Sequence, residues 1–294
     1  MPDYTSLNVQ VRPGYASISD PREKARTKGG GKRGVIRDFS KQARLRLMKK
    51  LMSLSQAPKH FVTLTYPAVY PADSSEWKNH LDNFFRVLHD RFPGHWFVWK
   101  LEPQKRGAPH FHLMGDLGIE LDAVGIYRLL RAIWSEVVGA TGENGRKHFF
   151  RGVQVENLQD SGHKKTSIYI SKYVGKPQDV ENMPEWSRPG RFWGVSNRKN
   201  MPAFQWDQIT LPQSCAVWLK RLVKRWMKRR SRRYSRQLST QHSYSIFSHP
   251  ELMRKILFWI LGPYQLEHWL SNSDYGDVYF YDPKSGLVPD EAPF

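Results

Sequence analysis

Two histidines separated by a single bulky residue are the part of this chain best suited to chemistry. The run Pro109-His110-Phe111-His112-Leu113 has the composition of a β-strand. In a strand, residues i and i+2 project from the same face. His110 and His112 are therefore expected to point together to one side, with Phe111 directed into a core. Two adjacent imidazoles form half of a site for a divalent metal ion.

A third ligand is available in the preceding segment. Residues 96–102 have the composition of a second strand, and residues 103–107 are typical of a tight turn. A hairpin would place Glu102 close to His110 across the strand pair. Two neutral nitrogens and one carboxylate suit Mn²⁺ or Mg²⁺, with coordination positions left for substrate oxygens. An isolated His-x-His is more often a surface pair or a structural pair, so the metal interpretation depends on the rest of the chain.

Residues 166–176 supply the second set of candidate residues, two tyrosines interleaved with lysines. On a helix, Tyr169 and Tyr173 are i and i+4 and share a face, and Lys172 and Lys176 form a second such pair beside them. A phenol with a pKa of about 10 is a poor nucleophile at neutral pH. Nearby cations and a metal-polarised phosphodiester would favour its attack on phosphorus, giving a phosphotyrosine ester and a free 3′-hydroxyl. The alternative is that both tyrosines pack the helix against a core.

The net charge of the chain indicates which kind of partner it binds. The 294 residues include 46 Lys and Arg against 27 Asp and Glu, a net charge of +19. This excess predicts a polyanionic partner, foremost nucleic acid, with an anionic membrane as the alternative. The single cysteine, Cys215, excludes an internal disulfide and a cysteine-based zinc cluster and is compatible with the cytoplasm of a bacterial host. The longest apolar stretch, 256–261, is too short to span a bilayer, so we expect no membrane partner.

One segment concentrates the positive charge. Residues 220–236 carry ten basic residues and no acidic one, with apolar residues at helical spacing. A helix with a dense cationic face suits a phosphate backbone, and an interfacial membrane helix is the competing interpretation. The candidate contacts to nucleic acid are Lys220, Arg221, Lys224, Arg225, Lys228, Arg229, Arg230, Arg232 and Arg233.

The order of the expected elements predicts an α+β fold, with helices packed on a five-stranded, mostly antiparallel sheet and the histidines on a central strand. Strands are expected at 60–67, 96–102, 109–113, 149–155 and 191–195. Helices are expected after Asp38 as N-cap, from Ser74 or Ser75, and over 120–138 and 166–176. Three parts are predicted, namely a flexible basic arm at 1–34, a core domain at 35–210, and a basic helix with a small helical tail at 211–294.

These motifs resemble those of the HUH endonuclease superfamily, in particular rolling-circle replication initiators of plasmids and single-stranded DNA phages. Residues 61–67 are similar to the first strand motif of that family, 109–113 to its paired-histidine motif and 169–176 to its tyrosine motif. Residues 102–107 and 191–195 are also similar to this group. The resemblance covers about 35–210, and the two tyrosines are similar to the two-tyrosine subclass.

The resemblance implies a metal-dependent, site-specific DNA endonuclease and strand transferase. It would nick single-stranded origin DNA, form a covalent 5′-phosphotyrosine, release a 3′-hydroxyl for rolling-circle replication, and later rejoin the ends. The chain contains no Gly-x-x-x-x-Gly-Lys-Ser/Thr motif, so a host helicase is expected to unwind the DNA for a host DNA polymerase. The alternatives are an insertion-sequence transposase of the same superfamily and a nucleic-acid-binding protein without catalysis.

Overall fold

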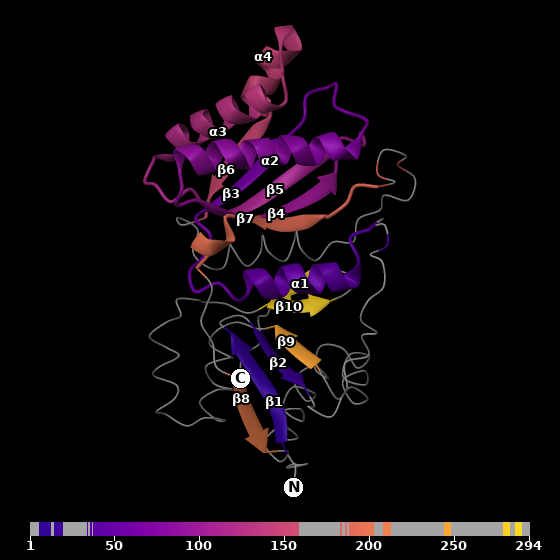
Figure 1. Ribbon diagram of the computed structural model, residues 1–294, viewed down its shortest axis with the longest axis vertical. Coiled ribbons are helices and arrows are strands. Elements are labelled where there is room, and N and C mark those ends of the chain that lie inside the picture. The colour runs from indigo at the N-terminus through magenta and orange to yellow at the C-terminus, as the bar shows by residue number, and fades with distance from the viewer. Residues whose placement is uncertain are drawn as a thin grey trace.

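The computed structural model (Figure 1) describes residues 38–158 and 188–202 continuously. It also describes Gly34, Ile36, Met183, Trp186 and six strands elsewhere in the chain. The expected tyrosine helix at 166–176 and the basic run at 220–236 lie outside the described residues.

A five-stranded sheet forms the centre of the described core. Its order is β6-β3-β5-β4-β7, and every neighbouring pair is antiparallel. The strands are β3 (His60–Thr65), β4 (Trp96–Pro103), β5 (Pro109–Asp116), β6 (Val153–Asn157) and β7 (Trp193–Ser196). This sheet and its helices confirm the predicted α+β fold, and β5, the histidine strand, is central as expected.

The hairpin that joins β4 to β5 has the register that the sequence suggested. Glu102 lies directly opposite His110, and Lys100 lies opposite His112. The connecting turn is closed by a hydrogen bond from the Gly107 N–H to the Gln104 carbonyl, 2.9 Å long. Gly107 adopts a φ of 84°, a left-handed conformation that glycine reaches without steric cost. The short turn therefore leaves one register for the pair.

Helices cover the sheet on both sides. α2 (Ser74–Arg91) and α3 (Ala123–Val137) pack on one face, and α1 (Lys41–Leu51) lies on the other side (Figure 1). α2 begins after Asp73, whose Oδ1 accepts a 2.8 Å hydrogen bond from the Ser75 N–H. α3 begins after Asp122 in the same way. A fourth helix, α4 (Gly142–Arg151), precedes β6.

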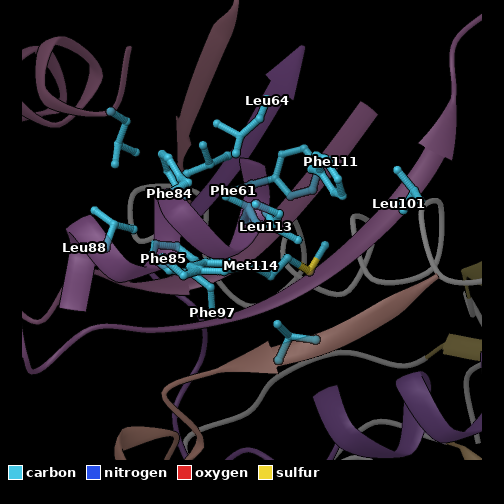
Figure 2. Packing of buried hydrophobic residues seen from close by; sticks show 14 of the residues in the cluster. Phe61, Leu64, Phe84, Phe85, Leu88, Phe97, Leu101, Phe111, Leu113 and Met114 are labelled. Atoms are coloured by element: carbon cyan, nitrogen blue, oxygen red, sulfur yellow. The ribbon is translucent and has the colours of Figure 1, made fainter. Parts of the chain in front are cut away.

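The hydrophobic core lies between the sheet and α2 and α3 and extends to the buried residues of α1. Figure 2 shows part of it, with Phe84 and Phe85 of α2 beside the sheet. Phe111 is fully buried, and its ring lies 6.3 Å from that of Trp134 in α3, edge to face. Burial of one such side chain contributes about 1.5–3 kcal/mol. Phe111 thus anchors β5 on the helical side while its two histidine neighbours face the other way.

Two local predictions were wrong. The N-cap of α1 is Ser40, whose Oγ accepts from the Ala43 N–H at 3.3 Å, and Asp38 lies outside the helix. Phe149 and Phe150 belong to α4, and β6 begins only at Val153. The aromatic pair has strand propensity, but both rings pack on the guanidinium of Arg131 in α3, 4.5 and 5.1 Å away. This tertiary contact favours the helix.

Further strands lie outside the central sheet. β1 (Ser6–Arg12) and β2 (Tyr15–Ser19), inside the segment expected to be a flexible arm, belong to a four-stranded sheet of order β8-β1-β2-β9. Its other members are β8 (Gln208–Pro212) and β9 (Tyr244–Phe247). β10 (Tyr279–Asp282) pairs with β11 (Gly286–Pro289), where a helical tail was expected. Alternation of Leu7, Val9 and Val11 with polar residues is the strand signal in this arm.

Candidate active site

Six polar side chains from three adjacent strands share one face of the sheet. β3, β5 and β4 align them in two rows across the ladder, and directly opposed residues project to the same side. This face is opposite to the one that α2 and α3 cover. The first row is Thr63, His112 and Lys100, and the second is Thr65, His110 and Glu102.

His112 is fixed from three directions. Its Nε2 lies 3.2 Å from Glu102 Oε2, and its Nδ1 lies 3.1 Å from Thr63 Oγ1. Its ring stacks on Phe61 at 5.3 Å with an interplanar angle of 18°. Only 7% of the residue is exposed. With a proton on Nε2, the ring donates to the Glu102 carboxylate, and Nδ1 accepts from the Thr63 hydroxyl.

His110 stands next to His112, with ring centroids 4.6 Å apart. Its Nε2 lies 3.1 Å from Thr65 Oγ1. Burial, together with the positive charge of His112 and Arg106, outweighs the attraction of Glu102 and lowers the pKa of His110 to about 3. The imidazole is therefore neutral at physiological pH, which is the form that binds metal ions.

Glu102 is ionised in spite of its burial. Burial alone would raise its pKa, but hydrogen bonding from His112 and the charge of Lys100 more than offset that effect and lower the pKa to about 2. Lys100 Nζ forms an ion pair with Glu102 Oε1. Lys100 is itself only 4% exposed, and its Nζ lies 4.9 Å from the centre of the Phe39 ring. The site thus holds a permanent carboxylate beside a neutral imidazole.

The donor set fits a divalent cation, although the side chains now satisfy one another. Two imidazoles and one carboxylate are ligands suited to Mn²⁺ or Mg²⁺. Within the described part of the chain, no three His, Cys, Asp or Glu side chains are positioned to share one ion. The Nε2 of His110 is engaged by Thr65, and one oxygen of Glu102 by Lys100. Joint binding would require His110 to exchange its hydroxyl partner for the ion.

Arg106 joins the hairpin turn to the end of β3. Its guanidinium donates to the carbonyls of Tyr66, Pro67 and Ala68, at 2.8, 2.9 and 3.0 Å. These residues follow Thr65 directly in the chain. The clamp therefore holds the Thr65 end of β3 against the strand that carries His110, and a rigid framework of this kind keeps site geometry within narrow limits.

Sequence reasoning about the site missed four residues, Thr63, Thr65, Lys100 and Arg106. The signal for the threonines was present, because two hydroxyls at i and i+2 in an otherwise apolar strand match the i and i+2 spacing of the histidines. Lys100 is an isolated charge in the apolar run 96–101 and shares a face with Glu102. The contacts of Arg106 had no local signal, since its partners lie about forty residues away.

Of the three predicted groups, the part of the chain that the structure describes contains the first. Glu102, His110 and His112 occupy one face, as described above. The expected catalytic residues Tyr169, Lys172, Tyr173 and Lys176 lie outside the described residues. The same holds for the expected DNA contacts Lys220, Arg221, Lys224, Arg225, Lys228, Arg229, Arg230, Arg232 and Arg233.

Comparison with known families supports the resemblance. Residues 59–178 match the model of the family described as replication-associated protein ORF2/G2P. The matched range contains the central strands β3, β5 and β4, with all six polar residues of the candidate site. The match is consistent with a rolling-circle replication initiator and supports a role in replication. No curated protein and no solved structure matches the chain. Among the described helices, none combines the length and apolar character that crossing a bilayer requires.

Proposed function

We propose that the chain is a metal-dependent endonuclease and strand transferase that starts rolling-circle replication by nicking single-stranded origin DNA. One observation carries the proposal. The β4–β5 register places the ionised Glu102 beside the two histidines on the central strand of the sheet, inside the range that matches a replication-associated family. This set of groups can hold a divalent ion on this face of the sheet.

In this proposal, Glu102, His110 and His112 hold Mn²⁺ or Mg²⁺. When bound, the ion supplies Lewis-acid polarisation of the scissile phosphate. Thr63 orients His112 by a hydrogen bond to the Nδ1 of the histidine, and the Phe61 ring stacks on the imidazole. Lys100 balances the charge of the carboxylate and adds positive charge near the site.

Covalent chemistry is assigned to the tyrosine segment. The phenolic oxygen of Tyr169 or Tyr173 attacks phosphorus, and the bond from phosphorus to the 3′-oxygen breaks. The phenol releases its proton to solvent, and the departing 3′-oxygen takes one up as the 3′-hydroxyl. The strand remains joined to the protein through a 5′-phosphotyrosine, so the reverse attack by a 3′-hydroxyl can rejoin the ends. Lys172 and Lys176 would lower the cost of forming phenolate.

The test is formation of a covalent adduct. Labelled single-stranded DNA is incubated with the full chain and Mn²⁺, then separated under denaturing conditions. We expect an adduct that survives denaturant with wild type, none with His110→Ala or His112→Ala, and near-normal DNA binding by both variants. Absence of adduct from wild type with retained binding would favour the non-catalytic alternative. Joining of cleaved ends to unrelated target DNA would favour the transposase.

Peptide mapping of the adduct identifies the nucleophile. One helical turn displaces the two phenols by about 5.4 Å, whereas reacting atoms must start about 3–3.5 Å apart. One tyrosine should therefore make the first cut, and we expect Tyr169 in that role. Labelling of Tyr173 alone, with a fully active Tyr169→Phe variant, would reverse the assignment. An adduct formed by the double phenylalanine variant would exclude both tyrosines.

A further inference from the structure

A groove of about 910 Å³ runs between α1 and β7. Its walls come from the segment that leads into α1, from one side of that helix, and from residues 191–198 around β7. None of these residues was singled out as a DNA contact by the sequence. The proposed chemistry uses none of them either, so the groove has no assigned task.

The lining of the groove is strongly cationic. Among its described lining residues, five are basic and one, Asp38, is acidic. The basic residues are Arg46, Lys49, Lys50, Arg191 and Arg198. The side chains of Arg46, Arg191 and Arg198 are exposed. An arginine guanidinium can donate two hydrogen bonds to one phosphate group. Such a lining therefore favours binding of a polymer with repeated phosphates.

An aromatic surface accompanies the charges. Trp193 lines the groove and is partly buried against the core. Its neighbour Phe192 stacks between Phe39 and Trp186, with ring centroids 6.0 and 6.2 Å away. This packing fixes the backbone beneath Trp193. Cationic walls with a rigid aromatic side chain are the combination that binds single strands without sequence preference, because bases stack on the ring.

The groove lies next to the candidate active site. Trp193 lies directly opposite Lys100 in the β4–β7 ladder, so one strand spacing of about 4.8 Å separates their backbones. Lys100 is the ion-pair partner of Glu102. Its Nζ also lies over the ring of Phe39, which sits between the lining residues Asp38 and Ser40. A single strand of nucleic acid in the groove would therefore reach the face of the sheet that carries the histidines.

We infer that this groove binds the single-stranded DNA that flanks the scissile phosphate, through its phosphates and by stacking on Trp193. The inference rests on the proposed function and names a second part of the substrate site. Arg46, Arg191 and Arg198 hold the backbone, and Trp193 positions one base next to the catalytic face. The groove would then deliver the strand to the site in one orientation.

The experiment compares two DNA lengths in two protein variants. The full chain is titrated, in EDTA, with a short oligonucleotide limited to the nick site and with versions extended by about eight nucleotides on either side. The groove variant is Arg46→Ala/Arg191→Ala/Arg198→Ala. The matched control, Arg86→Ala/Arg91→Ala/Arg128→Ala, removes the same charge from exposed positions on α2 and α3, over the opposite face of the sheet. Fluorescence anisotropy gives each dissociation constant.

We expect the groove variant to bind one of the extended oligonucleotides roughly tenfold or more weakly than wild type. The slope of its log affinity against log salt concentration should be shallower by about two. Affinity for the short oligonucleotide should change less than about twofold in both variants. Trp193→Leu, which keeps apolar bulk, should lose affinity for the same extended DNA. Equal losses in groove and control variants, or losses that do not depend on length, would overturn the inference. Failure of the proposed function is separate, since it would show as absence of adduct from wild type.

Discussion

Replacing Thr63 and Thr65 by valine, one at a time, should change metal affinity in opposite directions. Thr63 engages His112 through Nδ1 and so keeps Nε2 directed at the Glu102 carboxylate, where an ion would be bound. Thr65 instead engages His110 through Nε2 and so competes with an ion for that atom. Valine keeps the β-branched shape that a strand favours and removes only the hydroxyl function.

The magnitudes follow from these two contacts. Loss of a group that orients a metal-binding histidine costs about 10–100-fold in affinity. The neutral hydroxyl of Thr63, 3.1 Å from His112 Nδ1, should have an effect at the lower end of that range. Thr63→Val should therefore weaken Mn²⁺ binding about tenfold, or about 1.4 kcal/mol. One neutral hydrogen bond has a net value of about 1 kcal/mol. Freeing His110 from Thr65 should therefore strengthen binding about fivefold, a difference of about fiftyfold between the variants.

Isothermal titration of each folded variant with Mn²⁺ measures this difference, and urea unfolding checks that both variants are intact. Adduct formation at limiting Mn²⁺ should follow the same order. If both valine variants weaken binding equally, the hydroxyls act through general packing and not through particular ring nitrogens. If neither has an effect, the ion is held elsewhere and the site built on the two histidines is refuted.

Three further predictions concern the framework and the charged surfaces. Arg106→Ala removes three hydrogen bonds to backbone carbonyls and should lower the free energy of unfolding by about 1–3 kcal/mol in urea titrations, and Arg106→Lys should not restore it because one ammonium cannot span all three acceptors. Gly194→Val should destabilise by about 1–3 kcal/mol or more, because a Cβ there would lie 2.7 Å from the indole of Trp99; an unchanged melting temperature would show that the indole can move. Glutamine at every basic position of 220–233 should weaken DNA binding of all sequences alike and flatten its salt dependence, and an unchanged salt slope would assign the segment another task.

Several features of the protein follow from short-range patterns alone. The i and i+2 spacing places His110 and His112 on one face of a strand, because successive strand side chains alternate. A tight turn between two strand patterns leaves little freedom of register, so Glu102 opposite His110 could be anticipated. Buried positions at helical spacing in α2, including Trp77, Leu81 and Phe84, were likewise readable from the sequence.

Tertiary contacts decided the partners of the site residues and the secondary structure of some segments. Thr63 meets His112 only because β3 pairs with β5, and 49 residues separate the two side chains in the chain. No local periodicity reports a pairing between strands that are separated by a helix and a third strand. The helical state of Phe149 was likewise decided by packing on Arg131, against the strand propensity of aromatic residues.

One physical reason separates the features that the sequence predicts from those that only the tertiary structure decides. Chemistry that depends on neighbours along the chain, such as two imidazoles on one strand, is determined by backbone geometry and is visible in the sequence. Contacts that orient those imidazoles, and the cationic groove where Trp193 meets Lys100 across the ladder, join residues far apart in the chain. Only the order of strands in the folded sheet selects which of the many distant polar residues become partners.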